Sequence, residues 1–300
     1  MLSVKEFLKD VKLTEDTKEY LNETWSEIEK YVLRLKEYSD KHVQLFLREY
    51  LIEDVIDSSR MENSLYSFDI ISYYNAGVFD SFSDPEQVLK SVNKMVRKND
   101  KIIAREKYYN TYNGLTYDEY LELEKWNLSG NYRKNVVWIG NSNDIEKAIH
   151  VPPKPEEIPE YMKDLLDSLN NPQYEVSDEL KDPIIKAALL HMIFIKIHPF
   201  GNGNGRTARI LLNCCLRKGI NLRFDTKFLY PPINLSPSFQ FSKYSYNEYQ
   251  NNIIFRPDYD NNVAINKWIL YNLNSIKEQL YYLNQKLDKY NSFFSKLKIK

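Results

Sequence analysis

The most constraining feature of this 300-residue sequence is the segment Pro183–Ile197, where apolar side chains cover most of the helical wheel. A helix that is apolar nearly all round belongs in the centre of a domain. Pro199 pushes the residue before it, His198, out of the α region, so the helix is expected to end there. A second apolar stretch, Thr207–Leu216, predicts another buried helix, and Gly219 is a suitable residue to end it. The sequence therefore predicts two central helices joined by a short loop.

Helical patterns recur on both sides of this central pair. The twelve prolines begin only at Pro85, and Gly77 is the only glycine before that point, which favours uninterrupted helices in the first third. Apolar residues recur at helical spacing in four further segments: Thr17–Glu37, His42–Ile56, Tyr161–Leu169 and Ala264–Leu287. We expect the lysine-rich end that follows to fray. The predicted fold class is mainly α, a helical bundle.

One segment has the pattern of strands instead. Val136–Gly140 is a short run with β-type residues, and a turn-rich stretch of Asn, Ser and Asp follows it. Ala148–Val151 could then pair back on the first run. Pro152–Pro155 comes next and predicts an extended connector, because proline fixes φ. The sequence therefore predicts one small β-hairpin within the helical fold.

Composition excludes several classes of function. The chain has 41 Lys and Arg against 42 Asp and Glu, and this balance does not favour nucleic-acid or membrane-surface binding. No uncharged apolar run has membrane-spanning length, and the charged segment Met1–Tyr20 is not typical of a signal peptide. The two cysteines, Cys214 and Cys215, are adjacent and cannot link distant segments. They are expected to be core thiols in a protein of the reducing cytoplasm.

The loop between the two apolar helices has the residues of a phosphate site. Residues 198–209 read His-Pro-Phe-Gly-Asn-Gly-Asn-Gly-Arg-Thr-Ala-Arg. Glycines let the backbone approach a ligand closely, and the start of a helix offers free N–H groups to an anion. Arg206 and Arg209 share one helix face and can bind phosphate oxygens in pairs. His198 is a candidate general base beside them.

Other interpretations of this loop are weaker. Residues 203–208 fit the dinucleotide pattern G-x-G-x-x-A, but that pattern requires a preceding strand, and a helix is predicted here. The lysine and the glycine spacing of a P-loop are missing. His191 and His198 have no third His or carboxylate at metal-ligand spacing, so His191 is interpreted as a core histidine.

The loop resembles the signature of the Fic family, H-P-F-x-[D/E]-G-N-G-R-x-x-R. The matching residues are His198, Pro199, Phe200, Gly203, Asn204, Gly205, Arg206 and Arg209. The sequence departs at Asn202, where the family has Asp or Glu. Gly130–Arg133, Val136–Gly140 and Val151–Pro153 resemble the lead-in and flap of the family. The likeness covers roughly residues 58–254.

The resemblance implies transfer of AMP from ATP to a Ser, Thr or Tyr hydroxyl of a target protein, with release of pyrophosphate. His198 would take the hydroxyl proton, Arg206 would hold the β-phosphate and Arg209 the γ-phosphate. Phe200 would anchor the loop. The predicted hairpin would be a flap that docks an extended segment of the target.

Further nucleotide contacts are implied by the resemblance at Gly203, Asn204, Gly205, Val137 and Tyr249. Asn202 would replace the carboxylate that binds Mg²⁺, and its amide oxygen is a neutral, weaker ligand. Two alternatives therefore stay open. The chain could be a non-catalytic protein that senses nucleotide, or a transferase that uses a nucleotide other than ATP.

An upstream segment resembles the inhibitory motif of the same family, [S/T]-x-x-x-E-[G/N]. Ser58, Glu62 and Asn63 occupy its defining positions. Ser58 and Glu62 share one face of a helix, and Asn63 can adopt the left-handed conformation that ends it. The resemblance implies that Glu62 pairs with Arg209 and keeps the γ-phosphate from its productive position.

These features predict an organisation in three parts: an N-terminal helical region (1–57), a Fic-type catalytic domain (58–255) with an inhibitory helix near 58–63, and a C-terminal helical extension (256–300). The expected partner is a target protein with a hydroxyl side chain. Self-modification and a homodimer are further expectations, whereas partnership with a membrane or nucleic acid is not expected.

Overall fold

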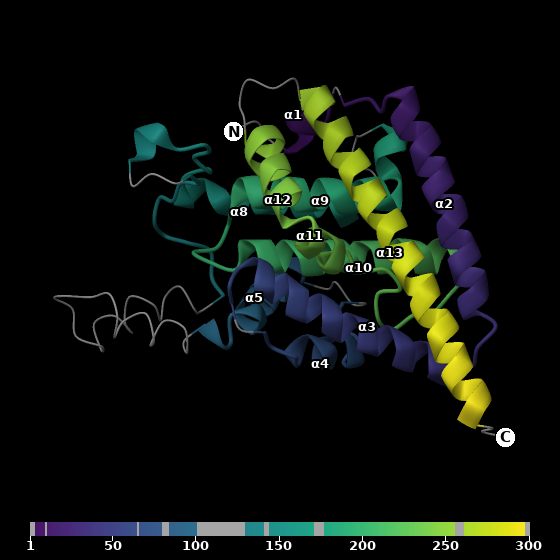
Figure 1. Ribbon diagram of the computed structural model, residues 1–300. Helices are drawn as coiled ribbons and strands as arrows, with labels where there is room; N and C mark the ends of the chain where they lie inside the picture. The colour runs from purple at the N-terminus through teal and green to yellow at the C-terminus, as the bar shows by residue number, and fades with distance from the viewer. Residues whose placement is uncertain are drawn as a thin grey trace.

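The structure is a computed structural model that describes residues 4–9, 11–64, 66–79, 84–100, 130–140, 144–170, 177–255 and 261–297. It is mainly α, as predicted, and its helices cross one another in a single packed body (Figure 1). The α-helices are α1 (Val4–Lys9), α2 (Glu15–Leu35), α3 (Asp40–Met61), α4 (Asp69–Asn75), α5 (Pro85–Val96), α8 (Ile158–Asn170), α9 (Pro183–Ile197), α10 (Asn204–Phe224), α11 (Ser236–Phe241), α12 (Lys243–Tyr249) and α13 (Asn261–Leu297).

The predicted apolar pair, α9 and α10, forms the centre of the molecule (Figure 1). Asp182 caps α9 by accepting hydrogen bonds from the main-chain N–H groups of Ile184 and Ile185, at 2.9 and 3.4 Å. Every residue of α9 from Ala187 to Ile195 is buried. This burial follows from the apolar wheel, because such a helix has no face suited to water. α9 ends at Ile197, directly before the loop of interest.

The second central helix is longer than the sequence predicts. α10 begins at Asn204 and continues past Gly219 to Phe224, where Asp225 adopts the left-handed conformation that ends it. Gly219 has a packing role instead. A Cβ built on it would lie 2.1 Å from the Cβ of Pro183, so only glycine lets α9 and α10 approach so closely. The expected helix end at Gly219 was therefore wrong.

Two long helices cover the central pair. α13 packs against both α2 and α9, and the indole of Trp268 donates a 2.8 Å hydrogen bond to the carbonyl of Ala188. α3 packs on α11 and α10 and continues through residues 57 and 58 without a break. Figure 1 shows α13 running diagonally across the molecule beside α2. Buried side chains from α1 to α13 belong to one hydrophobic cluster.

The predicted β-hairpin is not confirmed. Between residues 130–140 and 144–151 the structure shows only an isolated antiparallel bridge, between Ile139 and His150. A 3₁₀ turn at Ile145–Lys147, whose N-terminus is capped by the Asp144 carboxylate, lies just before the expected returning strand, Ala148–Val151. Among the described residues, pairing of this strand with the first run is limited to the one bridge. Residues 141–143, the expected turn, lie outside the described residues.

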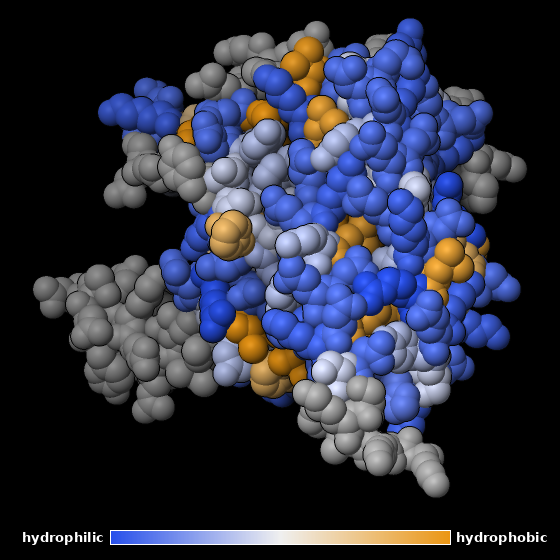
Figure 2. Space-filling view, turned by 45° about the vertical axis from the view of Figure 1, so that its right-hand side comes forward, coloured by the Kyte–Doolittle hydropathy of each residue, from blue (hydrophilic) through white to orange (hydrophobic). Residues whose placement is uncertain are grey.

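The molecular surface is predominantly polar. On the face in Figure 2, apolar residues appear as separate small patches among hydrophilic ones. Among the described residues, no helix combines the length and apolar character that crossing a membrane requires.

Candidate active site

The loop after α9 begins with a histidine in an unusual backbone conformation. His198 has φ 49° and ψ 57°, in the left-handed region that few side chains adopt. Arg133 supports this turn, because its Nε donates to the carbonyl of His198 at 2.9 Å. The main-chain N–H of Arg133 donates to the carbonyl of Pro199 at 2.9 Å, and its Nη2 donates to the carbonyl of Pro153. Arg133 therefore joins the loop to the segment before α8.

The middle of the loop is closed by two asparagines. Asn204 Oδ1 accepts from the N–H of Phe200 at 3.0 Å, and Asn204 Nδ2 donates to the Phe200 carbonyl at 2.8 Å. Asn202 Oδ1 accepts from the N–H of Gly203 at 2.6 Å. The Phe200 ring is buried and packs near the rings of Tyr132 and Phe194. Both asparagine amides are thus engaged within the loop that they shape.

The start of α10 has the geometry of an anion site. Gly203 takes φ 75° and lets the chain turn into the helix, whose first N–H groups have no partner within the helix. The positive end of the helix dipole lies at the same place. Gly203 also packs closely on the stem of Arg97, which a Cβ at this position would approach to 2.9 Å.

The first motif arginine is bound to a carboxylate. Both terminal nitrogens of Arg206 donate to Asp100, each at 2.8 Å, and Nη1 also donates to the carbonyl of Val96 at 2.6 Å. The Asp100 carboxylate also forms an ion pair with Arg97 at 3.4 Å. Arg206 is buried, and the Asp100 side chain is 11% exposed. This bidentate, nearly buried pair fixes Arg206 against the end of α5.

The second motif arginine meets the end of α3. Arg209 Nε donates to Ser58 Oγ at 2.9 Å, and Nη2 donates to the Ser58 carbonyl at 2.7 Å and to Glu62 Oε1 at 3.0 Å. The Glu62 carboxylate lies over the start of α10, because a Cβ built on Gly205 would come within 2.2 Å of its Oε1. Asn63 adopts φ 50° directly after it. A carboxylate oxygen therefore occupies the place that an anion would take at this helix start.

Buried polar contacts hold α3 in this position. One turn before Ser58, the Asp54 carboxylate accepts from Asn213 Nδ2 at 3.1 Å and from the Ser236 N–H at 3.0 Å. Burial raises the pKa of Asp54 to about 6. On the other side of Arg209, the hydroxyl of Tyr246 lies 3.4 Å from its Nη1 and 3.1 Å from His191 Nε2. α3, α10 and α12 are thus linked around one guanidinium.

The imidazole of His198 is neutral at physiological pH. Burial lowers the pKa of His198 from 6.5 to about 4, and the nearby Ile195 carbonyl and Glu62 carboxylate oppose that shift only in part. A neutral imidazole has one nitrogen free of a proton and can act as a base.

The residues here do not form a resident metal site. The expected metal ligand, Asn202, offers one neutral amide oxygen that already accepts from Gly203. No group of three or more His, Cys, Asp or Glu side chains with metal-binding geometry occurs among the described residues. Mg²⁺ prefers carboxylates together with phosphate oxygens.

Two further residues, Val137 and Tyr249, were expected to contact the nucleotide. Tyr249 stacks on Tyr271 with ring centroids 4.6 Å apart, and half-buried Val137 lies two residues before the Ile139 bridge. The structure adds three contact residues that were not predicted: Asp100, Tyr246 and Arg133. Tyr246 is one helical turn before Tyr249, and Arg133 lies in the lead-in segment that resembles the family, so both contact residues had an indication in the sequence. Asp100 had no such indication.

Part of this chain is similar to known proteins. Residues 113–216 match the Fic/DOC family. The chain is 37% identical over 115 residues to "Protein adenylyltransferase Fic" of Drosophila willistoni, covering 38% of this chain and 19% of that protein. It is 32% identical over 127 residues to the protein of the same name from Nematostella vectensis, covering 39% and 27%. The matched region thus spans well under a third of these relatives.

A solved structure shares the fold more widely. A Fic family protein from Desulfovibrio desulfuricans G20 superposes with a TM-score of 0.54, covering 93% of this chain and 77% of that one, at 19% sequence identity. Such a likeness concerns the fold alone. The sequence match to the Fic/DOC family thus covers residues 113–216, and the likeness of fold to a Fic family protein extends over most of the chain.

Proposed function

We propose that this chain is a protein adenylyltransferase. The hydroxyl oxygen of a Ser, Thr or Tyr on a target protein attacks the α-phosphorus of ATP. A new P–O bond forms to the α-phosphorus while the bond from that atom to the β-bridging oxygen breaks, and pyrophosphate leaves. His198 takes the hydroxyl proton. The start of α10 and Arg209 bind the phosphates and stabilise the charge that develops on the leaving group.

One observation carries this proposal: the loop that begins with a neutral histidine, His198, leads directly into the anion site at the start of α10. The Glu62 carboxylate lies against Gly205 and Arg209, where a phosphate group would find the same N–H groups and the same guanidinium. The lowered pKa of His198 keeps its imidazole in the neutral form, in which one nitrogen can accept a proton. The relatives named protein adenylyltransferase support the same chemistry for this domain.

We further propose that Glu62 holds the enzyme in an inhibited state. Its carboxylate and the γ-phosphate of ATP would compete for Arg209, and two negative groups cannot share that position without repulsion. The Glu62 side chain is 38% exposed, whereas Arg209 is 1% exposed. Glu62 can thus leave toward solvent while Arg209 stays in place. Release of Glu62 would admit the triphosphate in its productive position.

The test is labelling with ATP that carries the label at the α-phosphate. We expect the Glu62→Gly variant to label itself or proteins of a cell lysate more strongly than the wild type. Label at the γ-phosphate should not be transferred, because that phosphate leaves with pyrophosphate. A second variant, Glu62→Gly with His198→Ala, should lose the signal. Mg²⁺ is included as part of the nucleotide substrate.

A matched control is Glu37→Gly, an exposed glutamate just after the end of α2. This variant should label like the wild type, because Glu37 has no contact with the loop. Equal labelling in the wild type and in Glu62→Gly would reject the inhibitory role. Absence of any α-label transfer in both, with nucleotide binding intact, would favour the non-catalytic alternative instead.

The same labelling experiment can determine which nucleotide the protein prefers. Because Asn202 contributes no negative charge, we expect weaker dependence on Mg²⁺ than a carboxylate at this position would give. A panel of α-labelled ATP, GTP, UTP and CTP compares substrates directly. Preference for a nucleotide other than ATP would identify a different transferase on the same loop. Self-modification, a homodimer and a cytoplasmic location stay predictions.

A further inference from the structure

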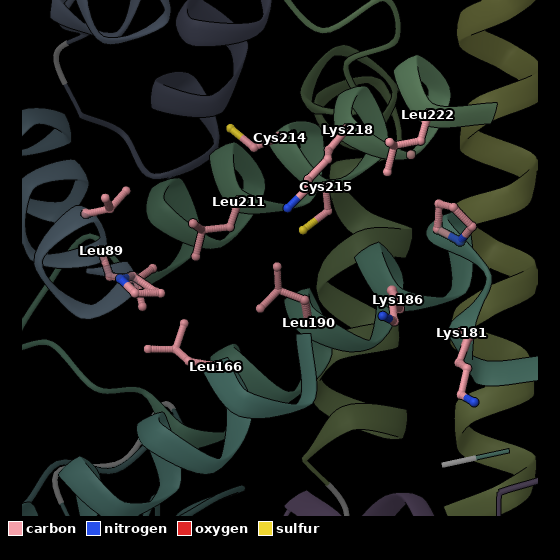
Figure 3. Close-up of a pocket in the computed structure, with 14 residues that line it drawn as sticks. Leu89, Leu166, Lys181, Lys186, Leu190, Leu211, Cys214, Cys215, Lys218 and Leu222 are labelled. Carbon is pink, nitrogen blue, oxygen red and sulfur yellow. The ribbon is translucent and has the colours of Figure 1, made fainter. Parts of the chain in front are cut away.

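A second cavity lies on the other side of α10 from the candidate active site. Its volume is about 270 Å³, and its α10 wall includes Leu211, Cys215, Lys218 and Leu222. With 3.6 residues per turn, these positions point away from the helix face that carries Arg209. Side chains from α5, α8 and α9 complete the wall (Figure 3). The cavity is thus separate from the loop chemistry described above.

The lining of this cavity is divided into an apolar part and a basic part. Leucines from four helices form the apolar part: Leu89, Leu166, Leu190 and Leu211. Three lysines also line it, Lys181, Lys186 and Lys218, whereas its described lining residues include no Asp or Glu. Figure 3 shows these lysines toward the Leu222 side and Leu89 and Leu166 toward the other. This arrangement is unusual for a chain whose total charges nearly balance.

Two of the lysines act on the same part of the cavity. Lys181 forms a 2.7 Å ion pair with Asp178. Lys186 from α9 and Lys218 from α10 both line the cavity, with Cys215 in the same wall (Figure 3). The charge of each of these two lysines also acts to lower the pKa of the Cys215 thiol. A negative group there would be attracted by both.

The cysteine itself does not indicate a reaction. Burial outweighs the two lysines and raises the pKa of Cys215 to about 11. The thiol therefore stays protonated at neutral pH, and a protonated thiol is neither a nucleophile nor a metal ligand. Cys215 is part of the wall, and the cavity has the character of a binding site.

We propose that this cavity binds a small amphipathic carboxylate, with its chain among the four leucines and its carboxylate beside Lys186 and Lys218. Ligand sites in proteins are concave and mostly apolar, with a few charged groups that set orientation. The apolar wall supplies most of the binding, because it removes hydrocarbon from water. The two lysines distinguish an acid from a neutral molecule of the same length.

The test uses dodecanoate as probe and the full chain, below the concentration at which dodecanoate forms micelles. Titration calorimetry should show saturable binding at one site. Replacing both lysines in Lys186→Glu/Lys218→Glu should weaken binding at least tenfold, because repulsion replaces attraction. Leu190→Trp should abolish binding by filling the apolar part. Dodecanol, which lacks the charge, should bind at least tenfold more weakly than dodecanoate.

The matched control is Lys30→Glu/Lys41→Glu, two exposed lysines on α2 and α3, which should bind like the wild type. Circular dichroism shows whether each variant is folded, and the charge variants keep the test usable if Leu190→Trp is not. The proposal is overturned if dodecanoate does not saturate or binds only as micelles. It is also overturned if dodecanol binds equally well, or if folded Lys186→Glu/Lys218→Glu binds like the wild type.

Discussion

At the scale of single residues, the two motif arginines differ in how they are held. Asp100 binds Arg206 through two hydrogen bonds and is nearly buried, whereas Glu62 binds Arg209 through one and is much more exposed. A buried bidentate pair resists exchange with a ligand, and a single exposed contact does not. We therefore expect Arg206 to position the loop, while Arg209 is the arginine that becomes available to phosphate.

The Asp100–Arg206 pair leads to a prediction about stability. Asp100→Ala leaves a buried guanidinium without its carboxylate, and breaking a buried pair in this way costs about 3–5 kcal/mol. Urea unfolding should show that loss. The double variant Asp100→Leu/Arg206→Met removes both charges and should recover most of it. Asp57→Ala breaks the exposed Asp57–Arg60 pair and should change stability by less than about 1 kcal/mol. Equal effects of Asp100→Ala and Asp57→Ala would contradict this account.

His198 leads to a prediction about pH. The folded pKa is lowered to about 4, so the imidazole stays in its basic, neutral form as the pH falls from 8 to about 5. Labelling by the Glu62→Gly variant should therefore stay level over that range. His198→Ala in the same background should lower the rate about 10²–10⁴-fold. Half-loss of activity near pH 6.5 would mean that the imidazole titrates as it does in water. Circular dichroism at each pH controls for unfolding.

The sequence could predict most of these residues but not all of their contacts. The motif residues from His198 to Arg209 are close in sequence, so their proximity in space follows from one loop. The Ser58–Arg209 contact spans 151 positions and could be expected only through the family resemblance. Asp100 pairs with Arg206 across 106 positions and belongs to no pattern, so nothing in the sequence indicated it. The roles of asparagine amides within the loop depend on hydrogen bonds that spacing does not specify.

At the scale of elements, the end of α3 decides where Glu62 lies. Glu62 directly follows the helix, and Asn63 turns the chain with φ 50°. The N–H of Ser64 then bonds back to the carbonyl of Ser59 at 3.0 Å, which closes the helix end. The position of the Glu62 carboxylate therefore depends on a residue that tolerates the left-handed conformation.

This dependence predicts a graded series at position 63. Asn63→Gly should keep the helix end and the inhibited state, because glycine adopts positive φ without a steric cost. Asn63→Ala should destabilise the turn by about 1 kcal/mol, and Asn63→Val by more. Basal labelling should rise in the order Gly, Ala, Val, measured by α-label incorporation at equal protein concentration. Equal labelling by all three variants would show that the turn does not control Glu62.

The element boundaries show where sequence patterns lose information. α9 ends where Pro199 requires, because that signal is local and steric. Gly219 carried an equally familiar signal, yet α10 continues through it, because the missing Cβ serves contact with Pro183. The hairpin is not confirmed: its two runs meet at an isolated bridge between Ile139 and His150, and a capped 3₁₀ turn at Ile145–Lys147 lies between them. A residue with two physical uses is ambiguous until its neighbours in space are known.

At the scale of the whole molecule, the C-terminal helix is part of the core that supports the site. Trp268 and Ile269 of α13 are fully buried, and the Trp268 ring stacks on His191 at a centroid distance of 5.3 Å. His191 in turn contacts Tyr246, whose hydroxyl is next to Arg209. A chain of contacts therefore runs from α13 to Arg209.

This chain of contacts predicts that the C-terminal extension is required for folding as well as activity. Deleting residues 256–300 would expose the face of α9 that α13 covers and remove the Trp268–Ala188 hydrogen bond. We expect the deletion to abolish cooperative thermal unfolding. Trp268→Ala alone should lower the free energy of unfolding by about 3–5 kcal/mol, as for other buried aromatic side chains. Deleting only residues 291–300 is the matched control and should have little effect, since the last buried leucine of α13 is Leu287 among the side chains described. If the longer deletion folded with an unchanged melting temperature and still labelled in the Glu62→Gly background, α13 would be an independent extension, and the supporting contact through His191 and Tyr246 would have no role in holding Arg209.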